Sequence, residues 1–172
     1  MKYLIMSDSH GDRDILRELI TKYENQVDLM FHCGDSELAK DDELIEKLIY
    51  VKGNVDFDNY EENKVINNQK QRFFLTHGHL YGVNFDLTKL ILKAQELQAN
   101  ICLYGHTHVP LVEYDEHNDL LVINPGSISQ PRIYPPIATY VILTVTETNY
   151  QVDYYNREHQ RINQLSRTLT KK

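Results

Sequence analysis

Five short apolar segments in the first two thirds of the chain each end beside a glycine and an acidic, amide or imidazole side chain. These segments are residues 3–6, 28–33, 49–52, 72–76 and 101–104. Their length and apolar character predict buried strands, and the glycines predict turns at their ends. In the first half of the chain the segments alternate with helical patterns, which favours right-handed crossovers and a largely parallel sheet. The chain is therefore expected to build an α/β fold.

Three stretches repeat apolar residues at the spacing of a helix with one buried face. They are residues 13–24, 41–48 and 88–98, and the spacing is the one that packs a single stripe of side chains against a core. Asp86 is a candidate N-cap for the third helix.

The later part of the chain changes from alternating strands and helices to consecutive strands. Residues 64–66 and 72–76 resemble a pair of strands, and residues 111–114, 120–123, 139–144 and 151–155 read as strands joined by turns, which favours antiparallel pairing. No linker rich in proline, glycine or serine divides the chain, so residues 1–172 are predicted to form a single domain with two sheets. Residues 160–172 contain the basic cluster and few apolar residues, and a frayed tail is expected there.

Seven oxygen and nitrogen donors follow the predicted strand ends. They are Asp8, His10, Asp35, Asn54, His77, His106 and His108. Because ligands of open α/β sheets bind beyond the carboxyl ends of the strands, these donors are expected to converge on one edge. Seven donors are too many for one metal ion that leaves room for a substrate, so two ions with a shared ligand are expected. Asp35 is the predicted bridge, because carboxylate oxygens have spare lone pairs.

Composition limits the partners of such a site. The formal net charge is −7, whereas a large nucleic-acid footprint needs a basic surface, so no long nucleic acid is expected. No apolar run approaches the roughly 18 residues of a membrane span, and no signal-peptide pattern precedes Asp8. Cys33 and Cys102 lie in apolar segments without metal-binding spacing, which predicts buried free thiols and a cytoplasmic location. A homodimer or tetramer is a reasonable expectation for a small enzyme.

The ordered set of motifs resembles the calcineurin-like metallophosphoesterase superfamily. The motifs are Asp8-Ser9-His10, Gly34-Asp35, Gly53-Asn54, His77-Gly78 and Gly105-His106-Thr107-His108, within residues 1–145. The short chain, Thr76-His77-Gly78-His79 and Asn124-Pro125-Gly126-Ser127 are similar to the small prokaryotic phosphodiesterase branch. The resemblance implies a four-layer α/β/β/α sandwich of two mixed sheets, with the metal site at the carboxyl ends of the strands.

The resemblance also implies which residues hold each ion. One ion would be bound by Asp8, His10, Asp35 and His108, and the other by Asp35, Asn54, His77 and His106. Members of this branch typically use Mn²⁺ and hydrolyse phosphodiesters. Mixed carboxylate, amide and imidazole donors also suit Fe, Zn²⁺, Ni²⁺ or Co²⁺. Two such cations hold a bridging hydroxide for attack on phosphorus and neutralise the charge that develops, so a metal-dependent phosphodiesterase is expected.

One motif departs from the family pattern. Many members have Gly-Asn-His followed by an acid, and that histidine is thought to protonate the leaving group. This chain has Gly53-Asn54-Val55-Asp56, with valine in place of the histidine. Asn54 remains a candidate catalytic and substrate-binding residue, and His79 or Asp56 is a candidate replacement for the missing acid. Asp56 could instead orient Asn54 or a ligand histidine, or be a solvated loop carboxylate.

Further candidates surround the predicted centre. His79 is either a phosphate contact or a structural imidazole, and Arg132 either binds a phosphate with two hydrogen bonds or braces the histidine loop. Loops 57–63 and 80–87 follow metal-bearing turns and are candidates for a rim that selects the substrate. Their aromatic residues either stack on the substrate or pack the loops onto the body; they are Phe57, Tyr60, Tyr81 and Phe85.

Three other functions fit parts of this pattern. A phosphomonoesterase or a nuclease for short oligonucleotides would use the same two-metal chemistry. A protein-binding scaffold is the non-enzymatic alternative, because a related retromer subunit keeps this fold after losing metal ligands. All seven donor positions are filled here, which favours the enzyme.

Overall fold

The computed structural model describes all residues from 1 to 172. Its helices are α1 (Arg13–Tyr23), α2 (Glu43–Glu46) and α3 (Thr88–Glu96), with the 3₁₀ helix η1 (His79–Tyr81) before α3. Its strands are β1 (Lys2–Met6), β2 (Leu29–His32), β3 (Ile49–Tyr50), β4 (Asn63–Asn68), β5 (Gln71–Thr76), β6 (Ile101–Leu103), β7 (Leu111–Asp115), β8 (Leu120–Asn124), β9 (Tyr140–Val145), β10 (Asn149–Tyr155) and β11 (Arg167–Thr170).

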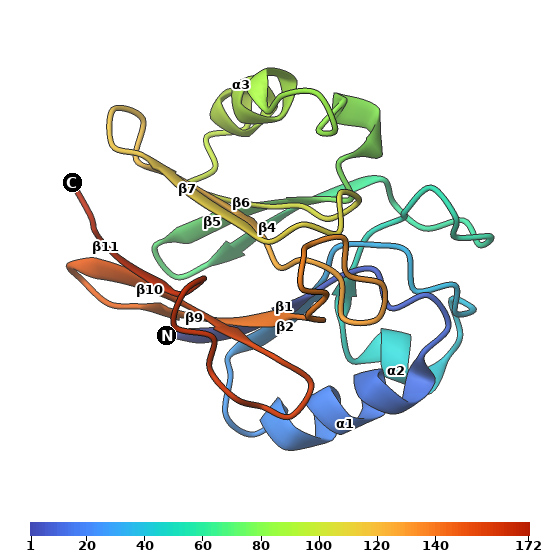
Figure 1. The fold of residues 1–172 in the computed structure, drawn as a ribbon. Coiled ribbons are helices and arrows are strands. Elements are labelled where there is room, and N and C mark those ends of the chain that lie inside the picture. The colour runs from blue at the N-terminus through green and yellow to red at the C-terminus, as the bar shows by residue number, and fades with distance from the viewer.

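The strands form two sheets that lie face to face. The first has the order β11-β10-β9-β1-β2-β3 and the second the order β4-β5-β6-β8-β7. Helices α1 and α2 cover the outer face of the first sheet, and α3 lies over the outer face of the second (Figure 1). The predicted fold class, a four-layer α/β/β/α sandwich with two mixed sheets, is confirmed.

Strand β1 shows why the apolar segments have no polar alternation. Tyr3 and Ile5 point into the core of 17 residues between the sheets, whereas Leu4 and Met6 point to the core that contains the apolar face of α1. A strand covered on both faces needs apolar residues at every position. The helix begins at Asp12, whose side chain accepts the backbone N–H of Ile15 at 3.2 Å.

Both sheets mix parallel and antiparallel pairs. Strands β1, β2 and β3 are parallel, as the sequence predicts, and β5, β6 and β8 are parallel in the second sheet. The other edge of β1, however, pairs with β9 in antiparallel register, and β9 continues to β10 and β11. The prediction of a largely parallel sheet is therefore correct only for its first three strands. The carboxyl ends of the parallel strands still meet at one end of the sandwich.

Three local predictions need correction. Helix α2 spans only Glu43–Glu46 instead of 41–48. Asp86 accepts the backbone N–H of Thr88 at 2.8 Å, but the N-cap of α3 is Leu87. The tail is not frayed throughout, since β11 pairs with β10 by backbone hydrogen bonds, which do not depend on an apolar sequence pattern.

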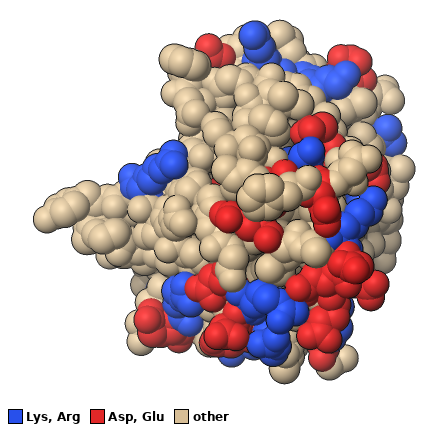
Figure 2. All heavy atoms as spheres, turned by 90° about the vertical axis from the view of Figure 1, so that its right-hand side faces the viewer, with Lys and Arg blue, Asp and Glu red and all other residues tan.

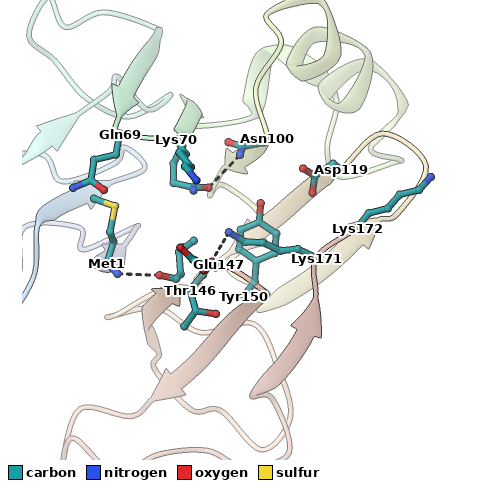
Figure 3. A pocket seen from close by; sticks show the side chains of 12 residues that line it. Met1, Gln69, Lys70, Asn100, Asp119, Thr146, Glu147, Tyr150, Lys171 and Lys172 are labelled. Atoms are coloured by element: carbon teal, nitrogen blue, oxygen red, sulfur yellow. Dashed lines mark hydrogen bonds between the residues drawn. The ribbon is translucent and has the colours of Figure 1, made fainter.

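Cys33 and Cys102 are buried free thiols, as predicted. Each helix is too short or too polar to span a lipid bilayer. A cavity of about 680 Å³ lies at the end of the sandwich that carries both chain termini, and Met1, Tyr150 and Lys171 are among the residues that line it (Figure 3). None of the seven predicted metal ligands lines this cavity.

Candidate metal centre

Five of the seven predicted ligands have a left-handed backbone conformation. Their φ angles are 55° for Asp8, 45° for His10, 59° for Asp35, 68° for His106 and 59° for His108. This region costs a residue other than glycine roughly 1–2 kcal/mol. Such conformations concentrate at binding and catalytic sites, where the surrounding fold holds them in place. The backbone therefore marks residues that the sequence motifs also select.

Asp8, His10 and His108 place three potential ligand atoms within 4.8 Å of one another. Nε2 of His108 lies 3.1 Å from Oδ1 of Asp8 and 3.3 Å from Nε2 of His10. Asp8 follows β1 of the first sheet, whereas His108 lies in the loop after β6 of the second. The site thus forms where loops from the two sheets meet.

Hydrogen bonds at the other ring nitrogen orient these two histidines. Nδ1 of His10 donates to Oε1 of Glu37 at 2.8 Å, and Nδ1 of His108 donates to the carbonyl of Gln130 at 2.6 Å. In the neutral tautomer each ring therefore turns the lone pair of Nε2 toward the other ring. A cation between the rings removes this repulsion, and such outer hydrogen bonds are typical of histidines that bind metals.

Asp8 also belongs to a second group, with Asp35 and His77. Nε2 of His77 lies 3.1 Å from Oδ2 of Asp35 and 4.0 Å from Oδ1 of Asp8. It also lies 3.1 Å from Oδ1 of Asn54. Nδ1 of the same ring donates to the carbonyl of Cys33 at 2.7 Å, so in the neutral tautomer Nε2 presents a lone pair to oxygen acceptors. A divalent cation satisfies all of these atoms at once.

Oδ1 of Asp8 is the atom of the centre that most clearly suits coordination to a cation. The residue is fully buried, and this oxygen receives no hydrogen bond. A buried polar atom without a partner costs free energy that a coordinated cation would recover. Burial opposes ionisation of Asp8, but the contacts with His108 and His77 outweigh it and hold the pKa of Asp8 below its ordinary value. These donors therefore fit divalent metal ions.

The structure places Asp8, rather than Asp35, in both groups of potential ligands. Burial also opposes ionisation of Asp35, and its hydrogen bond with His77 outweighs burial, so the pKa of Asp35 is likewise lowered. Two ionised carboxylates thus lie side by side in the centre. The assignment of Asp35 as the bridging ligand stays a prediction.

His106 lies beside the second group but contributes no atom to it. Its ring centre is 5.1 Å from that of His77, and its backbone N–H donates to Oδ2 of Asp8 at 3.2 Å. Nε2 of His106 lies 2.9 Å from Nδ2 of Asn84. Asn84 therefore connects the ring of His106 to the loop that follows η1.

Asp56 is buried, and both of its oxygens accept hydrogen bonds. Oδ2 accepts the backbone N–H groups of Asp35 at 2.9 Å and Gly53 at 2.7 Å, together with the hydroxyl of Tyr50. Oδ1 accepts the backbone N–H of Glu37 at 2.9 Å. These four hydrogen bonds hold the loops that carry Asp35 and Asn54, which favours a positioning role for Asp56. Its role as a candidate acid stays a prediction.

The glycines at two strand ends allow the loops to approach the ligands closely. A Cβ at Gly53 would collide with the carboxylate and the backbone of Asp35. At Gly105 a Cβ would collide with the hydroxyl of Ser7 and come within 2.8 Å of Oδ2 of Asp8. Only glycine leaves room for these carboxylates at such short range.

His79 lies next to the centre without a ligand position. Its ring centre is 5.4 Å from that of His77 and 6.2 Å from that of His106. Its Nε2 is 3.7 Å from Oε2 of Glu62, and its buried Nδ1 has no hydrogen-bond partner. Burial, and then the neighbouring His77, lower the pKa of His79. The roles of phosphate contact and structural imidazole both stay open.

The four aromatic residues of the rim loops divide into two kinds. Tyr60 packs its ring centre 4.5 Å from that of Tyr50, and Tyr81 donates its hydroxyl to a side chain of β4, so these two hold the loops. Phe57 and Phe85 are 87% and 93% exposed. They are the two rings free to contact a ligand.

Arg132 braces the histidine loop with its backbone, whose N–H donates to the carbonyl of His108 at 3.2 Å. Its side chain is exposed and makes no hydrogen bond or ion pair within the protein. His32 is fully buried and lies 3.0 Å from the hydroxyl of Ser9, and burial lowers the pKa of His32 to about 4. It is therefore a neutral packing histidine behind the site.

Sequence reasoning did not find Glu37 or Asn84, which hold His10 and His106. Glu37 lies two residues after Asp35, and this nearness was a weak sequence signal for its role. In the structure Glu37 has a φ of 58°. Asn84 is 22 residues from His106, and nothing local predicts that contact. The arrangement as a whole offers two groups of donors that fit divalent cations, which suits hydrolysis of a phosphate ester.

Comparisons with known proteins agree with this chemistry. The sequence profile of the calcineurin-like phosphoesterase superfamily domain matches residues 1–148. "Probable metallophosphoesterase YsnB" of Bacillus subtilis (strain 168) is 36% identical over 171 residues, which cover 99% of this chain and 99% of that protein. "Phosphodiesterase YfcE" of Escherichia coli (strain K12) is 42% identical over 64 residues, 37% of this chain and 30% of that protein. The crystal structure of a Streptococcus pneumoniae TIGR4 protein, described as a predicted phosphoesterase, superposes with a TM-score of 0.95 at 41% identity and covers 99% of this chain and 97% of that chain.

Proposed function

Because the chain belongs to the calcineurin-like phosphoesterase superfamily and is thereby a metal-dependent phosphoester hydrolase, we propose that it hydrolyses small phosphodiesters at a pair of divalent cations. The observation that supports two ions most directly is the presence of two groups of potential ligands around Asp8, whose buried Oδ1 has no hydrogen-bond partner. We assign one ion to Asp8, His10, Asp35 and His108, and the other to Asp35, Asn54, His77 and His106. Mn²⁺ is the proposed ion.

Residues of the chain would orient the metal ligands and contact the substrate. When bound, the cations activate a water for attack on phosphorus and neutralise charge on the phosphoryl oxygens. Glu37 and the carbonyl of Gln130 keep His10 and His108 in the orientation in which Nε2 is free. Asn54 turns Oδ1 toward His77, and its exposed amide N–H is proposed to donate to a phosphoryl oxygen of the substrate.

The surface favours a small substrate over a long nucleic acid. The face toward which β1 runs carries basic and acidic side chains intermixed, without a continuous basic patch (Figure 2). The net charge of −7 also disfavours binding of a long nucleic acid. With its buried free thiols, the enzyme is proposed to work in the cytoplasm. A protein-binding scaffold is a weaker candidate, because no donor of the set is missing.

The test of the proposed function is hydrolysis of bis(p-nitrophenyl) phosphate by metal-stripped protein, with and without Mn²⁺. We expect turnover only with the metal and its loss in His77→Ala, because Nε2 of His77 faces oxygens of Asp8, Asp35 and Asn54. His117→Ala, at an exposed histidine, is the control. No turnover by folded protein with Mn²⁺, Fe²⁺, Co²⁺, Ni²⁺ or Zn²⁺ would favour the scaffold instead.

The dependence of the rate on the leaving group tests the consequence of Val55. Because no imidazole follows Asn54 and the oxygens of Asp56 are engaged, the departing alcohol is expected to leave without a well-placed acid. Aryl esters should then be cleaved far faster than alkyl esters, with rates that fall steeply as the pKa of the leaving alcohol rises. A series of substituted phenyl esters measures the slope. A flat slope in the wild type that steepens in His79→Ala would instead make His79 the acid.

A further inference from the structure

A pocket of about 660 Å³ opens beside the proposed metal centre, on the side of His106. Asn84 lines the pocket and lies 2.9 Å from Nε2 of His106. Thr107, between the two histidines of its loop, lines the pocket as well. A diester whose phosphate is held at the metal centre can therefore reach this pocket with one of its two ester arms.

The walls of the pocket favour a flat apolar group. Val83, Tyr104 and Val109 supply apolar surface to the lining. Phe85, at 93% exposure, adds nothing to the core of the free protein. Its ring gains favourable burial only when a ligand covers it, and an aromatic ligand adds a stacking contribution.

The polar groups of the pocket favour a ligand with both acceptors and donors. Arg132 lines the pocket, and its guanidinium makes no hydrogen bond or ion pair within the protein, while its backbone N–H donates to the carbonyl of His108. It therefore has donors available for oxygen acceptors of a ligand. Asp86 and Glu113 also line the pocket and offer carboxylates to hydroxyl or amino groups.

We propose that this pocket receives the nucleoside half of the phosphodiester substrate. The base stacks on Phe85 and the apolar wall, and Arg132 donates to oxygen acceptors of that half. The inference rests on the proposed phosphodiesterase function and names the class of its substrate. A pocket of about 660 Å³ is of the size that binds a small organic ligand, which agrees with a single nucleoside.

Two esters with the same leaving group test the proposal. Thymidine 5′-(p-nitrophenyl phosphate) and methyl p-nitrophenyl phosphate both release p-nitrophenolate, so they differ only in the arm that the pocket would hold. We expect the thymidine ester to have a kcat/KM about tenfold higher, mainly through a lower KM, as stacking of one base predicts. Phe85→Ala should remove most of this preference. Phe57→Ala is the matched control, since Phe57 is also exposed but does not line the pocket.

Binding to the metal-free protein provides a readout that does not depend on catalysis. Calorimetry should show thymidine 5′-monophosphate binding about tenfold more tightly than 2-deoxyribose 5-phosphate, which lacks the base. Phe85→Ala should abolish the difference, and Arg132→Gln should weaken nucleotide binding. Equal kcat/KM for the two esters, an equal loss in Phe57→Ala, or no preference for the nucleotide in binding would overturn the proposal. Failure of both esters to react, with base-dependent binding intact, would instead refute the proposed hydrolysis and keep the nucleoside pocket.

Discussion

Asp8→Asn is expected to reduce metal-dependent phosphodiester hydrolysis by at least about 10³-fold, because it removes the carboxylate that both ligand groups share. Loss of an outer partner of a metal ligand already costs roughly 10–100-fold in affinity or activity. Loss of a carboxylate that binds an ion directly should cost more. The measurement is kcat/KM for bis(p-nitrophenyl) phosphate with saturating Mn²⁺, beside Asp41→Asn, which changes an exposed carboxylate.

Thermal unfolding separates loss of the metal from loss of the fold. Ligand at a thousand times its dissociation constant stabilises a protein by about 4 kcal/mol, which for a chain of this length raises Tm by roughly 8–16 °C. The wild type and Asp41→Asn should show such a rise with Mn²⁺, and Asp8→Asn should show little. Without metal, Asp8→Asn should be somewhat less stable than the wild type, because the lowered pKa of Asp8 means that its ionised form stabilises the folded protein at neutral pH. The readout for metal binding is therefore the rise in Tm with Mn²⁺. An Asp8→Asn variant that keeps the full rise in Tm would refute the assignment of Asp8 as a metal ligand.

Local pattern predicted much of the fold, because most elements bury one face or both. Unbroken apolar runs such as residues 3–6 indicate strands covered on two sides, and the period of α1 follows from its single apolar face. The place of β9 next to β1 could not be predicted, because the two strands are more than 130 residues apart and an apolar run does not specify its neighbour. Strand β11 was missed because an exposed edge strand is held by backbone pairing and needs no alternating sequence.

The predicted metal ligands were easier to identify from the sequence than the groups that orient them. The ligands follow strand ends, so their order in the sequence already places them at one edge of each sheet. What holds them depends on contacts between distant loops, such as Asn84 with His106, or on backbone carbonyls such as that of Cys33. Backbone groups are present at every residue, so no sequence pattern reports which of them a histidine will use. The role of Asp56 could not be predicted from the sequence either, because an aspartate can serve as a catalytic acid or accept the hydrogen bonds that hold a loop.

Asp56→Ala should destabilise the metal-free protein more than any other single change to a carboxylate near the site. It would leave four buried or half-buried donors without their acceptor, from Asp35, Glu37, Tyr50 and Gly53. At about 1–3 kcal/mol for each unsatisfied group, and with partial rescue by water, a loss of about 4 kcal/mol in the free energy of unfolding is expected. That is a large share of the roughly 5–15 kcal/mol of a typical domain. Urea denaturation measures the loss.

Two comparisons decide whether Asp56 positions the loops or acts in the chemistry. Asp58→Ala is the matched control, because that carboxylate accepts one exposed backbone N–H, from Lys40, and should cost less than about 1 kcal/mol. Asp56→Asn keeps the shape but puts an amide N–H where one of the donors points, so it should lower stability by about 1–3 kcal/mol. It should also weaken Mn²⁺ binding roughly 10–100-fold. The opposite result is that both Asp56 variants keep the stability and metal affinity of the wild type and lose only the rate on esters with poor leaving groups. That result would make Asp56 the acid. It would also show that the four hydrogen bonds do not hold the ligand loops in place.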